Sequence, residues 1–509
     1  MNIESSVIRL HPDDNVVIAR RQLMHGNPVE GDVVVANLVP AGHKIATRAV
    51  AVGEPVVRYG QIIGVATQPI APGHHVHVQN LAMSEFARDY MIGADVLSPP
   101  VSSVSETFLG IEREDGRVAT RNYIGILTSV NCSATVARGI ADYFRAGDGA
   151  ATLRDFSHID GVVSLTHGSG CATDSEGEPL AVLRRTLAGY ARHPNFAGLL
   201  IVGLGCETNQ IAGLMNEHGL SESAQLRTFN IQEVGGTTAA IATGVRLVQS
   251  MLAELPRIER RPVPVSRLIV GLQCGGSDGY SGITANPALG AAVDRLVAQG
   301  GTAILSETPE IYGAEHLLLR RAVSQAVGQK LLQRIEWWTD YCERNRSSMN
   351  NNPSAGNKAG GLTTILEKSL GAVAKGGTTA LRAVYEYAEP VAAQGLVFMD
   401  TPGYDPVSAT GQVAGGANVI CFTTGRGSAY GCAPSPSLKL GTNNALWARQ
   451  QADIDINCGV ILEGGVSVDE IGEQIYRSIL TTASGVRTKS EQHGYGQAEF
   501  VPWQLGATM

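Results

Sequence analysis

The chain has 509 residues, of which 44% are hydrophobic and 17% are charged, and its formal net charge at pH 7 is −8. This length exceeds what a single hydrophobic core supports, so we expect several domains. The acidic balance and the lack of a basic stripe argue against nucleic acid as a partner. No apolar run is long enough to span a membrane and the N-terminus has no basic or apolar leader, so we expect a cytoplasmic protein.

The N-terminal part, as far as about Ala82, alternates short β-type runs with turns and shows no helical periodicity. The expected strands are Asn15–Ile18, Asp32–Ala36, Pro55–Val57, Ile62–Ala66 and His75–Val78. This pattern predicts a small, barrel-like all-β domain over residues 1–83. The following stretch, 84–106, is irregular and contains paired prolines and several serines, which predicts a linker.

After Gly110 the sequence alternates between strands and helices. The expected strands are Tyr123–Ser129, Val162–Leu165, Leu199–Gly203, Leu268–Gly271, Thr302–Ser306, Leu396–Met399 and Val419–Thr423. Such alternation over roughly 400 residues predicts the α/β class, with mostly parallel sheets. We expect two α/β domains, a middle one over residues 107–262 and a C-terminal one over residues 263–509.

Capping signals mark several expected helices. Ser133 precedes a helical pattern, another helix is expected near Asn209, and Asn286 before Pro287 is the expected N-cap of a third. The last helix is expected to open with the capping box of Ser467 and Glu470. The long polar run 350–358 is expected to be an irregular, functional loop.

Four cysteines follow expected strands directly, namely Cys132, Cys171, Cys206 and Cys274. Ligands of open α/β sheets bind beyond the carboxyl ends of the strands, so a thiol there can meet a metal or a substrate. The alternative is that these cysteines pack as small hydrophobes. A disulfide framework is not expected in a long cytoplasmic chain with eight cysteines.

Histidines and acids accompany these cysteines. His75 and His77 would share one face of a strand, which suits a metal or a carboxylate, although a merely solvated strand face is the alternative. His43 lies beside Lys44 in a turn and can bind an acid group or be simply exposed. His167 shares a loop with Cys171.

Further charged residues lie in Gly- and Pro-rich loops after strands. They are Asp278, Glu307, Glu310, Lys358 and Arg426. Together they predict a pocket for an anionic substrate, with acids available for a metal or for proton transfer. Phosphate-binding and dinucleotide-binding glycine motifs are absent from the sequence, which argues against phosphoryl transfer and NAD chemistry.

With these segments in place, the chain resembles the altronate/galactarate dehydratase family. The matching motifs are Gly42-His43-Lys44, Gly203-Leu204-Gly205-Cys206-Glu207, Cys274-Gly275-Gly276-Ser277-Asp278, Ser281-Gly282-Ile283-Thr284-Ala285-Asn286-Pro287, Gly356-Asn357-Lys358 and Thr424-Gly425-Arg426-Gly427. The resemblance implies an N-terminal β domain of the SAF type joined to a large α/β part. It also implies an iron requirement and the dehydration of a sugar acid to its 2-keto-3-deoxy derivative.

The substrate stays open between altronate and galactarate. The segment His75-Val76-His77 is similar to the altronate branch of the family. The segment Glu336-Trp337-Trp338 resembles the galactarate branch to the same degree. A related activity, sulfolactate desulfonation, divides the two parts between separate subunits and is a further alternative. A non-catalytic sugar-acid-binding protein is the competing class, and we expect a homo-oligomer.

Roles follow from this chemistry as hypotheses. The expected catalytic residues are His43, Lys44, His167 and Glu207. The expected substrate-binding residues are Ser277, Asp278, Asn286, Asn357, Lys358 and Arg426. The expected metal ligands are Cys132, Cys171, Cys206, His75 and His77. Iron(II) held by nitrogen and oxygen is one form of the metal, and an iron–sulfur cluster held by the three cysteines, with one iron left for substrate, is the other.

Overall fold

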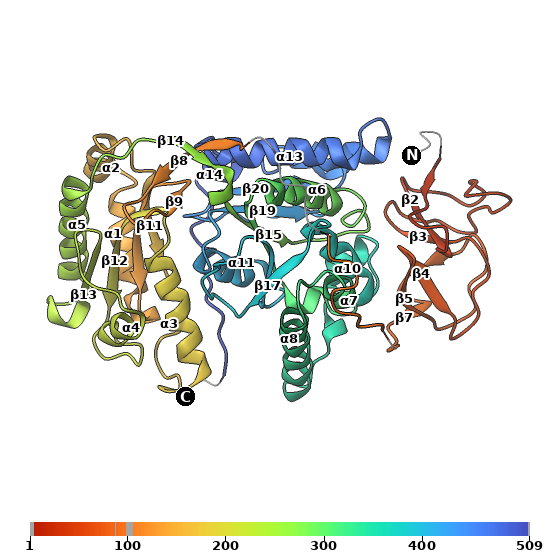
Figure 1. Cartoon of the computed structure of the whole chain (residues 1–509), viewed down its shortest axis with the longest axis horizontal. Coiled ribbons are helices and arrows are strands. Elements are labelled where there is room, and N and C mark those ends of the chain that lie inside the picture. The colour runs from red at the N-terminus through yellow and green to blue at the C-terminus, as the bar shows by residue number, and fades with distance from the viewer. Residues whose placement is uncertain (1–4, 87, 98–104, 507–509) are drawn as a thin grey trace.

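The structure is a computed structural model that describes residues 5–86, 88–97 and 105–506. Three parts lie in a row along the longest axis, with the N-terminal β domain at one end, the middle α/β domain at the other and the C-terminal α/β domain between them (Figure 1). Among the described residues, none of the helices has the length and apolar character needed to cross a bilayer.

The β domain consists of two small antiparallel sheets, which confirms the predicted all-β unit. One sheet contains β1 (Val7–Ile8), β2 (Val16–Ala19), β3 (Lys44–Ala46) and β6 (His75–Val76), and the other contains β4 (Pro55–Arg58), β5 (Gln61–Ala66) and β7 (Leu81–Ala82). The predicted strand Asp32–Ala36 is wrong. That stretch lies between two turns and contributes only an isolated bridge between Pro28 and Val34.

The middle domain is built on a four-stranded parallel sheet in the order β11-β10-β12-β13. Its strands are β10 (Tyr123–Thr128), β11 (Gly161–Leu165), β12 (Phe196–Gly203) and β13 (Leu226–Asn230). Helices α1 (Ala134–Tyr143) and α5 (Thr237–Glu254) share a core on one face, and α3 (Glu178–Ala191) and α4 (Ile211–His218) cover the other. The short helix α2 (Gly147–Arg154) follows α1.

The C-terminal domain is built on a seven-stranded parallel sheet in the order β17-β18-β16-β15-β19-β20-β21. The strands are β15 (Ile269–Cys274), β16 (Thr302–Leu305), β17 (Leu381–Tyr385), β18 (Gly395–Met399), β19 (Val419–Thr424), β20 (Ser437–Gly441) and β21 (Ile456–Asn457). The chain builds one side of the sheet from β15 and then returns through β19 to build the other. The carboxyl ends of β15 and β19 therefore form the switch point at which open α/β sheets bind ligands.

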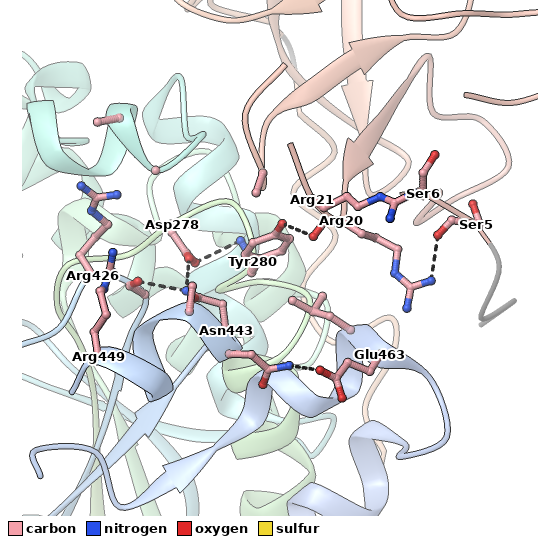
Figure 2. Close-up of a pocket in the computed structure, with 17 residues that line it drawn as sticks. Ser5, Ser6, Arg20, Arg21, Asp278, Tyr280, Arg426, Asn443, Arg449 and Glu463 are labelled. Atoms are coloured by element: carbon pink, nitrogen blue, oxygen red, sulfur yellow. Dashed lines mark hydrogen bonds between the residues drawn. The ribbon is translucent and has the colours of Figure 1, made fainter. Parts of the chain in front are cut away.

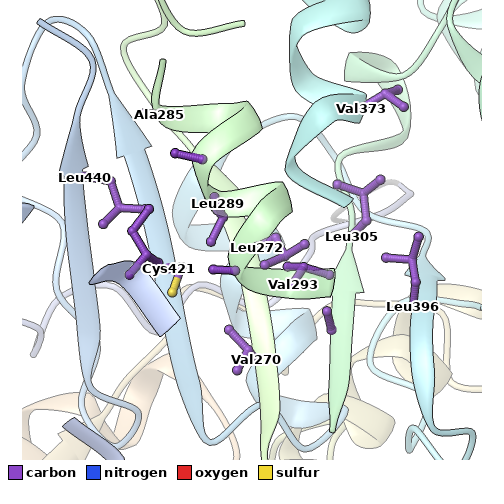
Figure 3. Close-up of a cluster of buried hydrophobic side chains, with 14 of the residues drawn as sticks. Val270, Leu272, Ala285, Leu289, Val293, Leu305, Val373, Leu396, Cys421 and Leu440 are labelled. Atoms are coloured by element: carbon purple, nitrogen blue, oxygen red, sulfur yellow. The ribbon is translucent and has the colours of Figure 1, made fainter. Parts of the chain in front are cut away.

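Helices cover both faces of this sheet. Helices α6 (Ala285–Ala298) and α13 (Val468–Ala483) pack together on one face, where Leu289 and Val293 of α6 lie beside the β15 side chains (Figure 3). Helix α11 (Asp405–Ala414) covers the other face. The remaining helices are α7 (Glu315–Leu319), α8 (Gln325–Arg344), α9 (Ala355–Ala359), α10 (Ile365–Val373), α12 (Asn444–Arg449) and α14 (Lys489–Gln492).

Two local predictions are wrong and one is confirmed. Helix α6 has Thr284 as its N-cap, and the Asn286 amide inside the first turn instead donates to the Gly371 carbonyl at 2.9 Å and accepts from Thr423 at 2.7 Å. The run 350–358 is not irregular, because it contains part of a 3-10 turn and most of α9, which opens with a capping box. The capping box of Ser467 and Glu470 at α13 is confirmed.

Shared apolar cores hold the three parts together. One core combines Leu187 and Ile201 of the middle domain with Val397 and Phe422 of the C-terminal domain. Another combines β-domain residues such as Ile63 with C-terminal residues on α6 and α10. A further, three-stranded sheet of β14 (Arg261–Pro264), β8 (Thr107–Glu112) and β9 (Val118–Ala119) lies where the middle and C-terminal domains meet (Figure 1). Rotation of one part against another would expose these cores to water.

Candidate active site

A cavity of about 560 Å³ lies between the β domain and the carboxyl edge of the seven-stranded sheet in the C-terminal domain (Figure 2). Four arginines line it, namely Arg20, Arg21, Arg426 and Arg449. Among the described residues that line the cavity, the carboxylates are those of Asp278 and Glu463. Because guanidinium groups recognise carboxylates through paired hydrogen bonds, this excess of positive charge suits an anionic ligand. We call this site the arginine cavity.

Asp278 organises the loops at the floor of the cavity. Its carboxylate accepts hydrogen bonds from Thr442 at 3.0 Å, Asn443 at 2.9 Å and Ser281 at 3.1 Å. Burial raises the pKa of Asp278, although these hydrogen bonds act in the opposite direction. A Cβ at Gly425 would lie 2.2 Å from the Asp278 Cγ atom, so the loop carrying Arg426 requires glycine there.

Three histidines of the β domain form a cluster beside this cavity. The ring centroids of His43, His75 and His77 are 5.0–5.4 Å apart. Burial lowers the pKa of His43 to about 4 and that of His75 to about 3, and it also lowers the pKa of His77. The three imidazoles are therefore neutral near pH 7 and able to accept a proton or bind a metal. We call them the histidine cluster.

Main-chain carbonyls of the C-terminal domain orient this cluster. Nε2 of His77 lies 2.8 Å from the Lys358 carbonyl, and Nε2 of His43 lies 3.3 Å from the Ala359 carbonyl. Nδ1 of His43 lies 3.0 Å from Nε2 of His75. If His43 donates from Nε2, its Nδ1 accepts from His75, and Nδ1 of His75 keeps a lone pair.

A buried ion triad joins the β domain to the C-terminal domain. Lys44 Nζ donates to both Glu367 oxygens at 2.8 and 2.9 Å and to the Gly361 carbonyl at 2.7 Å. Arg58 also pairs with Glu367 and donates to the Gly279 carbonyl at 2.7 Å. Although burial alone would raise the pKa of Glu367, the two cations hold it at about 2. The Lys44 ammonium, predicted to be catalytic, thus faces Glu367 and a carbonyl oxygen.

The three cysteines of the middle domain lie at the carboxyl ends of three adjacent strands, and all three are exposed. Their loops are joined by hydrogen bonds. Asn131 N donates to the Ser169 carbonyl at 3.0 Å, and Asn209 N donates to the Gly170 carbonyl at 2.9 Å. The Gln232 amide lies 3.4 Å from the Cys206 sulfur. We call Cys132, Cys171 and Cys206 the thiol group.

His167 and Glu207, both predicted to be catalytic, are buried and lie in the loops that carry Cys171 and Cys206. The His167 ring contacts the Thr128 carbonyl at 2.9 Å through Nε2, and burial lowers its pKa to about 4. Glu207 accepts from Ser129 at 2.6 Å and from the Gly205 N–H at 2.7 Å. Burial alone would raise the pKa of Glu207, but these hydrogen bonds lower it. Both side chains hold the loops that present the thiols.

A second buried cluster was not predicted as a unit. Cys274, Glu307 and Glu310 are the one group of three or more His, Cys, Asp or Glu side chains, among the residues that the structure describes, close enough to share a single metal ion. Lys375 Nζ, however, lies 3.0 Å from the Cys274 sulfur and 2.6 Å from Glu307, and Lys368 Nζ lies 2.7 Å from Glu310. These ammonium groups already occupy the positions that a cation would need.

The predicted substrate-binding residues are only partly brought together. Asp278 and Arg426 line the arginine cavity. The Ser277 carbonyl accepts from the buried Asn357 amide at 2.9 Å, Lys358 is half-buried, and Asn286 is inside α6. Sequence reasoning missed several residues of the cavity and its supports, namely Arg20, Arg21, Asn443, Arg449, Glu463 and Glu367. The arginine pair directly after a strand was the available signal.

The fold and the site together define an α/β protein of the class that handles small anionic molecules at the switch point of a parallel sheet. Similarity to known proteins identifies the family within this class. The chain matches the family descriptions "Altronate/galactarate dehydratase SAF domain" over residues 5–84, "D-galactarate dehydratase/Altronate hydrolase, second domain" over 110–256 and "D-galactarate/Altronate dehydratase, C-terminal" over 265–508. The chain therefore belongs to the galactarate/altronate dehydratase family, whose dehydratases are hydro-lyases.

Curated relatives span nearly the whole chain. Altronate dehydratase of Bacillus subtilis is 32% identical over 99% of this chain and 100% of its own length. Galactarate dehydratase (L-threo-forming) of Escherichia coli is 35% identical over 96% of this chain and 94% of its own length. The (2R)-sulfolactate sulfo-lyase subunit beta of Chromohalobacter salexigens is 30% identical over 78% of this chain and 97% of its own length.

The ion triad leads to a stability prediction. We expect Glu367→Gln to lower the free energy of unfolding by about 3–5 kcal/mol, because it leaves two buried cations without a carboxylate. The pKa of Glu367 is lowered from 4.5 to about 2, so its contribution is complete above about pH 4.5 and is lost as the pH falls toward 2. Urea unfolding between pH 7 and pH 3 measures both effects. The exposed Glu336→Gln is the control, and a Glu367→Gln chain as stable as this control would contradict the role of the triad.

Proposed function

We propose that this chain is an iron-dependent hydro-lyase that removes water from a six-carbon sugar diacid of the galactarate type and forms the 2-keto-3-deoxy derivative. The observation that carries the proposal is the arginine cavity, which lies beside neutral histidines in a chain of this family. Membership of the family supports the reaction type, and the charge distribution of the cavity supports the choice of substrate.

Two arginine pairs favour a diacid over the monoacid altronate. Arg20 and Arg21 come from the β domain, and Arg426 and Arg449 come from the C-terminal domain, with Asp278 and Tyr280 between the two pairs (Figure 2). A galactarate-type substrate carries a carboxylate at each end, so each pair would bind one of them. Altronate carries one carboxylate and would engage only one of the two pairs.

The reaction removes a proton from C2 and a hydroxyl from C3. Arginines that bind the carboxylate next to C2 stabilise the enediolate charge that develops there. The histidine cluster supplies a neutral imidazole as proton acceptor, and the negative substrate would raise its pKa toward the working range. Buried Lys44 and Glu367 fix the start of β3, directly after His43, and so act by positioning.

The thiol group fits an iron–sulfur cluster better than a single ion. Three exposed sulfurs on adjacent strand ends, with an amide beside the Cys206 sulfur, match the donor set that such clusters use. Among the described residues, the sulfurs of the thiol group are not close enough to one another to share a single metal ion. When bound, the cluster would supply a Lewis-acidic iron that stabilises negative charge on substrate oxygens.

A second candidate is desulfonation of sulfolactate. This chain matches both the beta subunit and, over 47 residues, the alpha subunit of the Chromohalobacter sulfo-lyase. Sulfolactate also carries two anionic groups, which the two arginine pairs would accept. A sugar-acid-binding protein without catalysis is the remaining alternative.

A substrate assay tests the proposal directly. We expect the anaerobic, iron-reconstituted chain to convert galactarate into a 2-keto acid with a kcat/KM at least tenfold above that for altronate, and to release no sulfite from sulfolactate. Faster turnover of altronate would overturn the choice of substrate, and sulfite release would favour the desulfonation reaction. Thermal stabilisation by galactarate without any product would favour the binding protein.

Arg426→Ala tests the cavity. Loss of a hydrogen bond to a charged group costs about 1.5–3 kcal/mol, so we expect the kcat/KM for galactarate to fall by about 10- to 100-fold. The exposed Arg154→Ala, in the middle domain, is the matched control. Equal kinetics of the two variants would show that Arg426 does not contact the substrate.

Cys171→Ala tests the thiol group. After anaerobic reconstitution with iron and sulfide, we expect the parent chain to show broad visible absorption and bound sulfide, and the variant to lose both. The half-buried Cys342→Ala should retain them. Unchanged absorption and full activity of Cys171→Ala would contradict the cluster assignment.

A further inference from the structure

The thiol group and the arginine cavity lie in different regions of one chain. The β domain and the middle domain occupy opposite ends of the long axis (Figure 1). The cavity lies against the β domain, and its described lining comes only from residues 5–41 and 278–463. The thiols lie at the carboxyl edge of the middle sheet. A single chain as folded here therefore presents the two halves of the proposed site on separate surfaces.

Domain movement does not bring these surfaces together. Helix α3 of the middle domain packs on α11 so closely that a Cβ at Gly189 would lie 2.4 Å from the Ala414 carbonyl oxygen. The buried triad of Lys44, Arg58 and Glu367 fixes the β domain on the opposite side. Opening either junction would expose an apolar core or separate buried charges, both of which are costly.

Each half of the site is open to solvent. Arg21, Arg426 and Arg449 are exposed at the cavity, and the three thiols are exposed on the middle domain. Exclusion of water strengthens the electrostatic stabilisation of an enediolate, and exposed thiols are open to oxidation. A cover over both surfaces would therefore favour the reaction and protect the thiols.

The charges of the two surfaces are complementary. The exposed loop from Cys171 to α3 carries Asp174, Glu176 and Glu178, whereas the cavity presents the exposed Arg21, Arg426 and Arg449. Opposite charges on facing surfaces favour association and fix its register.

We propose that a second copy of this chain completes the active site, with the acidic loop and thiol group of one copy covering the arginine cavity of the other. This inference rests on the proposed function. The order of the parts along the axis allows it, because two chains side by side in opposite directions place each middle domain against the partner's β domain. A two-fold dimer of this kind contains two equivalent composite sites.

Complementation between two inactive variants tests the proposal. Arg426→Ala damages the cavity and Cys171→Ala damages the thiol group, so each variant dimer lacks an intact site. A dimer of one copy of each contains one site with both defects and one site with none. We expect differently tagged heterodimers to recover about half of the parent activity per dimer and to bind half of the parent sulfide.

Three other results would contradict the shared site. Heterodimers no more active than the variant homodimers would overturn the shared site, while turnover of galactarate by the parent chain would leave the proposed function standing. Full activity of the Cys171→Ala homodimer would show that the thiol group takes no part in the reaction, and would thereby overturn this inference. A parent chain that is active and monomeric in sedimentation would also overturn it.

Charge reversal gives a readout independent of activity. We expect Asp174→Lys with Glu176→Lys to weaken dimerisation at least tenfold in sedimentation equilibrium, and Arg21→Glu with Arg449→Glu in the partner to restore it. Glu336→Lys, an exposed reversal on α8, is the matched control. Equal dimerisation of the loop variant and this control would contradict the proposed contact.

Discussion

The buried contact of Glu367 with Lys44 and Arg58 is the interaction on which the arrangement of the site depends. All three side chains are within 1% of full burial; Lys44 and Arg58 belong to the β domain and Glu367 to the C-terminal domain. The cost of burying them is offset only while the three remain together. Because Lys44 adjoins His43, and the Gly279 carbonyl bound by Arg58 adjoins Asp278, one contact sets both the histidine cluster and the floor of the arginine cavity.

The rest of the cavity follows from close backbone approach. Gly279 and Gly361 both lie against the Gly42 carbonyl, where a Cβ would come within 2.0 and 2.5 Å of the oxygen. This packing lets the β domain approach the switch point of the parallel sheet closely enough to add Arg20 and Arg21 to Arg426 and Arg449. The arginines of the cavity thus come from two domains, and the ion triad holds these domains in register.

Much of the fold could be predicted from the sequence, because buried parallel strands are continuous apolar runs between turn residues. The strands around the thiols and the helix after Ser467 follow such local rules. Asn286 could not be assigned from its position before Pro287, since its amide bonds to segments more than 80 residues away. The run 350–358 folds into short helical turns through a Ser–Asn capping box that a count of polar residues does not detect.

The candidate site was predictable only at the level of strand ends. Cysteines and charged loops were correctly expected at carboxyl edges, but the sequence does not say which edges meet. Arg20 and Arg449 line one cavity although more than 400 residues separate them. The thiol group lies on a different surface from the histidine cluster. This separation depends on how the domains pack, which the sequence pattern does not indicate.

Hydrogen exchange with galactarate under iron-free, non-turnover conditions tests the central claim most directly. The account predicts slower exchange in the segments around Arg20–Arg21, Gly425–Arg426 and Asn443–Arg449, and loss of this protection in Arg426→Ala. Unchanged exchange in all three segments at a galactarate concentration that saturates binding would contradict the arginine cavity as the substrate site.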